Sequence, residues 1–298
     1  MIYQHPLAYL LGLEGLALLR AWAGDHDRAF VEERLDEVRR LLAREDLSTH
    51  AGVEVARADV AAGYRDWART YDDEPRNTLF EIDEPIVHGV LDGLRSGQAL
   101  DAACGTGRFA ASLVARGHQV IGVDASPEML AVARTQIPEA EFRLGDVTAL
   151  PVEDASVDLV VCGLALSHVA SLPTAMTEFA RVLRPGGDLV ISDVHHDLVF
   201  RGSVVKAIGP AGEPGLVATH LHTPGDYLRA ALDVGLDVRR CEEPRLPSTD
   251  ARAGGPMQDV GIGEWADWPW SLIPIVPEAT RVAWATPALV IWHFRRSR

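Results

Sequence analysis

The sequence predicts an α/β fold around a seven-stranded, largely parallel sheet. Strand patterns alternate with helical patterns over the C-terminal two thirds of the chain, and this alternation is typical of parallel sheets with right-handed crossovers. An apolar strand at 99–103 runs into a glycine turn at 104–108, which a helix follows. A second strand, 119–124, ends in the carboxylate of Asp124. Strand, glycine turn, helix, strand and acid in this order predict a nucleoside pocket at the carboxyl edge of the sheet.

The remaining elements follow from periodicity and from proline and glycine punctuation. Further strands are expected at 142–145, 157–163, 188–193, 236–241 and 287–294. Helices are expected at 56–70, 85–94, 127–136, 172–183 and 224–234.

The first 54 residues read as a helical extension ahead of a domain at 55–298. Two helices are expected between 7 and 44, followed by a polar linker at 46–54. The first helix carries leucines on more than one face, so we expect it to bury against the domain or, preferably, against a second subunit in a homodimer. Insertions at 195–223 and 243–284 follow strand ends and predict an α-rich lid over the ligand edge.

Composition narrows the class of protein. The formal charge of −15 disfavours nucleic-acid binding, because phosphates would be repelled. Three cysteines, Cys104, Cys162 and Cys241, lack metal-ligand spacing and indicate reduced thiols in a cytoplasmic protein. The sequence has no apolar run of membrane-spanning length, so no membrane partner is expected.

The glycine turn by itself leaves the ligand open. Gly105 and Gly107 allow close approach of a ligand to the backbone, and Asp124 can accept hydrogen bonds from ribose hydroxyls. A dinucleotide turn would place a third glycine where Ala110 stands. Asp101 puts a negative charge beside the turn, which disfavours a pyrophosphate and favours an ammonium or a sulfonium.

Four motifs in order resemble class I S-adenosylmethionine (SAM)-dependent methyltransferases. They are Asp101-Ala102-Ala103-Cys104-Gly105-Thr106-Gly107, 123–130, Gly145-Asp146-Val147 and Leu183-Arg184-Pro185-Gly186-Gly187. Ala103 stands where the family more often has glycine. The resemblance covers about 64–294 and is nearest the small-molecule branch with the ubiquinone and menaquinone methyltransferases, in a natural-product type typical of actinobacteria. It implies a Rossmann-like sheet whose last strand is antiparallel.

The resemblance implies SAM as cofactor and S-adenosylhomocysteine as product. The implied cofactor-binding residues are Tyr64, Tyr71, Asp101, Ala103, Gly105, Gly107, Arg108, Asp124, Ala125, Met129, Asp146, Val147 and Gly163. Asp146 would accept from the adenine amine, the Val147 amide would donate to the ring, and Met129 would pack on its face. The alternatives are a helix N-cap for Asp146 and ordinary core packing for Met129.

Histidines at strand ends and a group of tryptophans are the candidates for acceptor chemistry. Tyr71, His168, His195 and His196 are predicted at the transfer point, where a histidine can remove a proton. His168, His195, His222, Trp265, Trp268 and Trp270 are predicted to bind the acceptor. The alternatives are hydrogen-bonded loop histidines, and tryptophans that pack within the lid or at a subunit contact.

A metal site is not predicted. His195, His196, Asp197, His220 and His222 have suitable side chains. However, adjacent histidines point in different directions on an extended chain, and no helical i, i+4 pair occurs among them.

The sequence thus predicts methyl transfer from SAM to a small aromatic or heterocyclic acceptor, for which an indole would suit the tryptophans. An NAD-type Rossmann oxidoreductase and a SAM-binding protein without catalysis remain as alternatives. Transfer to protein or nucleic acid is disfavoured by the acidic charge and by the lid.

Overall fold

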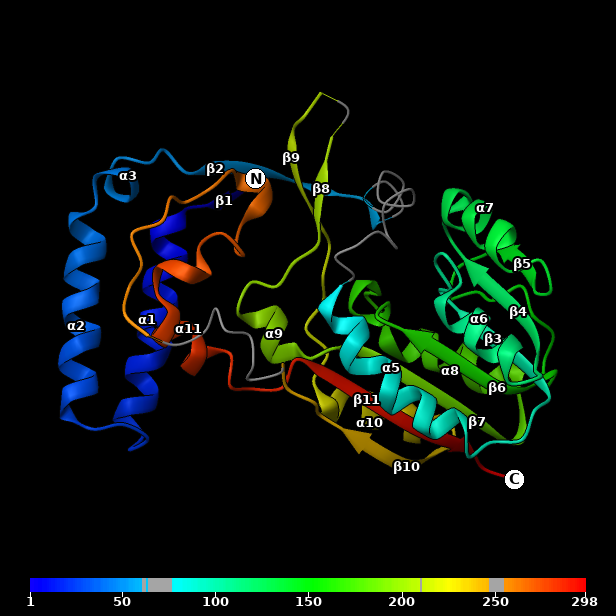
Figure 1. Ribbon diagram of the computed structural model, residues 1–298. Helices are drawn as coiled ribbons and strands as arrows, with labels where there is room; N and C mark the ends of the chain where they lie inside the picture. The colour runs from blue at the N-terminus through cyan, green and yellow to red at the C-terminus, as the bar shows by residue number, and fades with distance from the viewer. Residues whose placement is uncertain (61–62, 64–76, 210, 247–254) are drawn as a thin grey trace. The chain divides into compact units, whose positions relative to one another are not determined.

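The computed structural model describes residues 1–60, 63, 77–209, 211–246 and 255–298 (Figure 1). The chain forms two compact units. The larger unit comprises Asp59–Arg201, Val217–Pro244 and Pro287–Arg298, and the smaller comprises Met1–Ala58, Gly202–Leu216 and Arg245–Thr286. Within the described ranges, no helix has the length and apolar character needed to cross a bilayer.

The larger unit contains a seven-stranded sheet. From edge to edge its strands are β10 (Leu236–Glu242), β11 (Leu289–Arg296), β7 (Leu183–Val194), β6 (Val157–Gly163), β3 (Gln98–Ala102), β4 (Gln119–Asp124) and β5 (Glu141–Leu144). The pairs β7–β6, β6–β3, β3–β4 and β4–β5 are parallel, whereas β11 is antiparallel to both of its neighbours. The predicted sheet and its antiparallel last strand are confirmed.

Helices cover both faces of this sheet because neighbouring strand residues point to opposite sides. Leu100, Val160 and Ile191 pack into one core with the helices α8 (Leu172–Val182) and α10 (Pro224–Leu232). Their neighbours Ala99, Val161 and Val190 point to the other face of the sheet. They pack into a second core with α5 (Thr78–Leu91), α6 (Arg108–Ala115) and α7 (Pro127–Gln136). The carboxyl ends of the parallel strands therefore meet at one edge, between two helical layers.

The smaller unit combines segments that the sequence predicted as separate modules. Its elements are β1 (Ile2–Gln4), α1 (Pro6–Trp22), α2 (Arg28–Ala43), α3 (Glu45–Ser48), β2 (Val53–Ala58), β8 (Lys206–Ile208), β9 (Pro214–Val217), η2 (Trp265–Asp267), η3 (Ile273–Ile275) and α11 (Pro277–Ala283). The strands form one sheet in the order β1-β2-β9-β8. The predicted extension at 1–54 is thus not a separate module, and the predicted linker at 46–54 contains most of α3 and the start of β2. Distant segments share one core here, and periodicity carries no information on such pairing.

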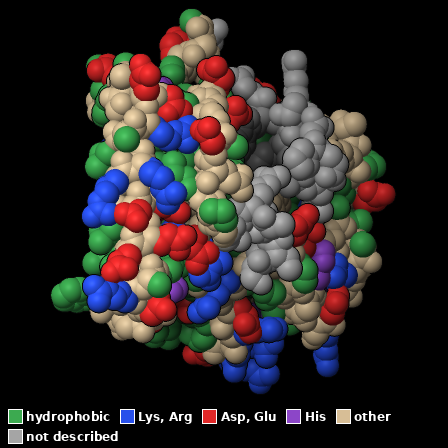
Figure 2. Space-filling model, turned by 60° about the vertical axis from the view of Figure 1, so that its left-hand side comes forward, with side chains coloured by type: hydrophobic (Ala, Val, Ile, Leu, Met, Phe, Trp, Pro, Cys, Tyr) green, Lys and Arg blue, Asp and Glu red, His purple; other side chains and the backbone are tan. Residues whose placement is uncertain are grey.

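Two helices of the smaller unit pair through buried charges as well as leucines. Arg34 on α2 is fully buried and donates to both carboxylate oxygens of Glu37, at 2.9 and 3.1 Å. Glu14 on α1 is also fully buried, with one oxygen 3.7 Å from Arg34, and burial raises its pKa to about 8. The outward face of α2 carries interspersed acidic and basic side chains (Figure 2).

Candidate functional site

The turn after β3 has a left-handed backbone at three positions. Gly105 has φ +55° and open space where a Cβ would stand. Gly107 has φ +97°, and a Cβ there would lie 2.4 Å from Ile137 Cδ1. Ala103 has φ +56°, a conformation that glycine adopts without strain and alanine does not. The alanine at this position thus leaves a strained residue at the mouth of the turn.

Asp124 is held by the same turn. Its Oδ2 accepts from the Gly105 amide and its Oδ1 from the Ser126 amide, both at 2.8 Å. A carboxylate has about four lone-pair sites, so each oxygen keeps the capacity to accept once more. Burial raises the pKa of Asp124, and the two amides oppose that rise. The carboxylate is therefore pre-oriented as an acceptor for two neighbouring hydroxyl groups.

Asp101 supports the turn from within. Its side chain is 2% exposed, and Oδ2 accepts from the Ala110 amide in the first turn of α6, at 2.7 Å. Burial raises the pKa of Asp101 to about 7. Asp101, which was predicted to place a negative charge beside the turn for an ammonium or a sulfonium, is thus a buried acid that holds the start of a helix.

Arg108, which was predicted to bind the cofactor, is engaged by groups of the protein itself. It donates through both terminal nitrogens to the buried Asp83 of α5, at 2.7 and 2.9 Å, and its guanidinium lies over the rings of Phe80 and Phe109. Asp83 also accepts from the Ser192 hydroxyl of β7, at 2.7 Å. This pair joins α5, α6 and β7 behind the turn, so we assign Arg108 to the support of the site.

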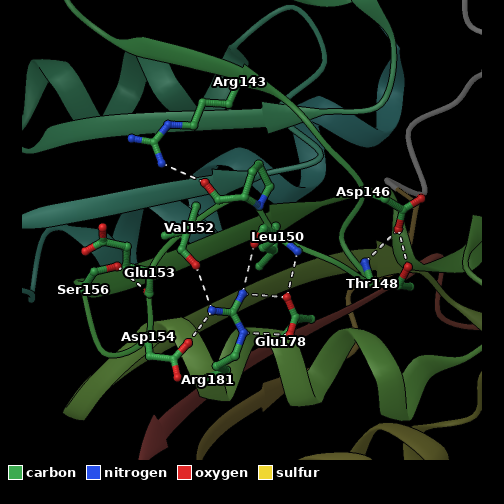
Figure 3. A network of polar contacts seen from close by, with 11 residues as sticks. Arg143, Asp146, Thr148, Leu150, Val152, Glu153, Asp154, Ser156, Glu178 and Arg181 are labelled. Atoms are coloured by element: carbon green, nitrogen blue, oxygen red, sulfur yellow. Dashed lines mark hydrogen bonds and ion pairs between the residues drawn. The ribbon is translucent and has the colours of Figure 1, made fainter.

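Asp146 follows β5 and lies on the surface. Its Oδ1 accepts from the Thr148 amide (2.7 Å) and hydroxyl (2.6 Å), as a cap would, but no helix begins there. Figure 3 shows its other oxygen pointing away from Thr148. That oxygen can accept a hydrogen bond from an amine of a ligand.

The loop after Asp146 is fixed by an ion pair on α8 (Figure 3). Arg181 donates to the carbonyls of Val152 (2.8 Å) and Leu150 (3.0 Å), and Glu178 accepts from the Leu150 amide (2.7 Å). Arg143 donates to the Pro151 carbonyl at 2.8 Å. The backbone of this loop is thereby held from both sides.

The remaining predicted cofactor contacts differ in exposure. Ala125 is exposed beside Asp124. The side chains of Val147 and Met129 are only 8% and 2% exposed, which for Met129 favours the packing alternative. Gly163 is required by packing, because a Cβ there would lie 2.3 Å from the ring of Phe109. Tyr64 and Tyr71 lie outside the described residues.

Two of the predicted histidines use their Nδ1 atoms in opposite roles, one as a donor and one as an acceptor. His168 Nδ1 lies 2.9 Å from the Ala218 carbonyl, which can only accept, so Nδ1 is the donor of this hydrogen bond. His195 Nδ1 accepts from the Asp197 amide at 3.2 Å, so its proton is on Nε2, which donates to Glu243 at 2.9 Å. Both ring nitrogens of His195 are therefore engaged, Nδ1 in capping α9 (His196–Phe200) and Nε2 on Glu243, and this engagement disfavours the predicted role of His195 as a base.

His196 and His222 are placed differently. His196 Nδ1 is buried without a hydrogen-bond partner among the described residues. The ligand atoms of His195, His196 and Asp197 lie within 4.8 Å of one another, the one such group found in the described part of the chain. His222 Nε2 donates to the Val169 carbonyl at 2.8 Å, so this ring holds backbone.

The predicted tryptophans belong to the smaller unit. Trp268 is 6% exposed in the core of that unit and donates its indole N–H to the Ile262 carbonyl at 3.0 Å. It has no free face for an acceptor, so that prediction is wrong for Trp268. Trp265 donates to Gln4 at 2.8 Å and carries Lys206 over its ring. Trp270 is 56% exposed and meets Trp284 edge to face.

The sequence missed a buried polar pair below His168. Tyr227 of α10 donates to Asp193 at the end of β7, at 2.7 Å, and both side chains are buried. Burial raises the pKa of Asp193 despite hydrogen bonds from Tyr227 and Ser167. An acid at a strand end was a usable signal for Asp193, whereas nothing in the helical pattern distinguished Tyr227.

Comparisons with known proteins agree with this geometry. Residues 100–191 match the family model described as "Methyltransferase domain". The demethylmenaquinone methyltransferase of Chlorobaculum tepidum is 40% identical over 119 residues, 40% of this chain and 48% of that protein. The malonyl-[acyl-carrier protein] O-methyltransferase of Erwinia pyrifoliae is 38% identical over 136 residues, 45% of this chain and 50% of that protein. The chain thus spans about half the length of these curated relatives.

A solved structure shares the fold. The S-adenosylmethionine dependent methyltransferase of Mesorhizobium loti superposes with a TM-score of 0.50 at 23% identity, over 70% of this chain and 96% of that one.

Proposed function

We propose, on the premise that residues 100–191 belong to a class I SAM-dependent methyltransferase domain, that this protein methylates a small aromatic or heterocyclic molecule. SAM is the cofactor of such a domain, and it supplies a methyl group already activated on sulfonium. The protein then has to bind and orient two reactants and to accept a proton.

The observation that carries the proposal is the fixed carboxylate of Asp124. Its two amide contacts orient it towards the glycine turn, with acceptor capacity for both hydroxyls of a ribose. Asp146 Oδ2 is the matching acceptor for the adenine amine one strand further along the sheet. These residues fit SAM, and the missing third glycine disfavours the oxidoreductase alternative.

His168 is the base that the geometry supports best. Its Nε2 carries the lone pair and can accept the proton that an attacking hydroxyl or ring N–H group loses as the new bond to the methyl carbon forms. Tyr71 and His196 remain further candidates for this end of the site. The exposed Trp270 remains a candidate for stacking on a flat acceptor, for example an indole-like natural product.

We further propose that the protein is a homodimer. Leu19 and Trp22 on α1 are 65% and 91% exposed, and they line an apolar groove of about 560 Å³ with Gly12 and Gly15. Exposed apolar surface of this kind is typical of association sites. Sedimentation of the wild type and of Trp22→Glu tests this, because a dimer through α1 should dissociate in the variant.

Calorimetry with SAM tests the cofactor assignment. Asp124→Ala should weaken SAM binding by about 1–3 kcal/mol, since hydrogen bonds to a charged acceptor are lost. The matched control is Asp92→Ala, which removes an exposed carboxylate that pairs with Arg116. Equal affinity in the wild type and Asp124→Ala would exclude Asp124 as the ribose acid.

A panel of phenols, aromatic amines and indoles tests the reaction. Mass spectrometry should find a methylated product together with S-adenosylhomocysteine. SAM binding without turnover on any acceptor class would favour the non-catalytic alternative, and NAD binding would favour the oxidoreductase.

A further inference from the structure

A short segment of the larger unit, Val217–Thr223, runs along the turn that carries His168. Every second residue of this segment makes a hydrogen bond to the turn η1 (Leu166–His168) or to Val169, the residue after it. The Ala218 carbonyl accepts from the His168 ring (2.9 Å), the His220 amide donates to the Ser167 carbonyl (2.6 Å), and the His222 ring donates to the Val169 carbonyl (2.8 Å). We call this segment the strap.

The strap is anchored beyond these three bonds. The His222 ring stacks with His220 at 6.1 Å and meets the Tyr227 ring edge on, also at 6.1 Å. Tyr227 is in turn fixed by Asp193. Thr223, the last residue of the strap, caps α10 in a reciprocal pair with Asp226. The strap therefore has a defined position relative to both η1 and α10.

We propose that the strap is a positioning element that fixes the proton of neutral His168 on Nδ1 and thereby presents Nε2 as the base. The inference rests on the proposed function through the role of His168. The Ala218 carbonyl can only accept, so it selects the form of His168 in which Nδ1 is the donor. His222 holds the strap, and with it this carbonyl, against the turn by donating to the Val169 carbonyl.

The same contact favours the product of proton transfer. When Nε2 accepts a proton from the methyl acceptor, the ring becomes positively charged and Nδ1 still donates to the Ala218 carbonyl. Hydrogen bonds from a charged donor are stronger than those from a neutral one. The strap thus orients the base before transfer and stabilises it afterwards, as an orienting partner does for other catalytic histidines.

The test measures the tautomer directly in the full chain without ligands. Two-bond ¹H–¹⁵N correlation spectra of histidine-labelled protein, at a pH where the ring is neutral, distinguish the two nitrogens, and His168→Gln assigns the signal. We expect wild-type His168 to be in the Nδ1–H form. His222→Ala should convert this signal to a mixture of both forms, and His222→Gln should restore it because its amide can still donate to Val169.

His220→Ala is the matched control. It removes the neighbouring ring of the strap but keeps the His220 amide that donates to Ser167, so the His168 signal should stay in the Nδ1–H form. Wild-type His168 in the Nε2–H form, or an unchanged signal in a folded His222→Ala, overturns the proposal. A failed methyl-transfer panel with the expected tautomer would instead count against the proposed function alone.

Discussion

The buried pair of Asp83 and Arg108 provides a quantitative test of how the cofactor turn is supported. The Asp83 side chain is fully buried and that of Arg108 is 13% exposed, and the two are joined by bidentate contacts at 2.7 and 2.9 Å. Replacing Asp83 by leucine removes the bidentate partner of the Arg108 guanidinium, leaves it the longer contact to Glu84 (3.4 Å), and deprives Ser192 of its acceptor. Removing one partner of a buried pair costs about 3–5 kcal/mol.

Arg108→Met should cost less than Asp83→Leu if packing on Phe80 and Phe109 is kept, and the double variant should be more stable than the sum of the two changes implies. Replacing a whole buried pair with apolar groups is often close to neutral. We therefore expect a coupling energy of about 2–3 kcal/mol. In a domain of this size, a loss of 3–5 kcal/mol lowers Tm by roughly 6–20 °C.

Hydrogen exchange read by peptide mass spectrometry is the suitable assay, because it reports the larger unit separately from the smaller one. Calorimetry with SAM on each folded variant adds a second readout. Additive effects of the two substitutions would refute the structural pairing. A loss of SAM affinity with Arg108→Met alone would restore Arg108 as a direct cofactor contact.

Two further predictions follow from burial. Burial raises the pKa of Asp101 to about 7, above the roughly 3.9 of an unfolded Asp, so the folded state binds more protons and stability falls as pH rises from about 4 to 7. Asp101→Asn should lessen this loss of stability, which amounts to about 1.4 kcal/mol per unit of pKa shift. Denaturant titrations of both proteins at pH 5 and 8 measure it, and an equal pH dependence in the two proteins would contradict it. Trp268→Ala should destabilise the smaller unit by about 3–5 kcal/mol, whereas Trp270→Ala should cost about 1 kcal/mol or less, as hydrogen exchange would show. Equal losses of stability in the two variants would contradict the burial of Trp268.

The sequence by itself determined the seven-stranded sheet of the larger unit. Local signals were sufficient there: each strand and helix has its own periodicity, and the glycine turn and Asp124 lie within 25 residues of one another along the chain. Since parallel strands end at one edge, strand order and acid position predicted that Asp124 lies beside the glycine turn.

Tertiary structure decided the roles of side chains that are served by distant partners. His168 and His195 are indistinguishable in the sequence, yet the Ala218 carbonyl binds Nδ1 of His168 whereas Glu243 binds Nε2 of His195. Arg108 became a supporting residue because α5 brings Asp83 to it. A hydrogen-bond partner 25 or 50 residues away leaves no periodic trace.

The smaller unit shows the same limit on a larger scale. The pattern of residues 1–54 correctly indicated two helices. The helices of residues 1–54 share one core with residues 257–284, and β1 and β2 join β9 and β8 in one four-stranded sheet. Both depend on contacts between segments about 150–250 residues apart. Burial of Trp268 and pairing of β2 with β9 are consequences of that assembly, and they follow from packing rather than from local propensity.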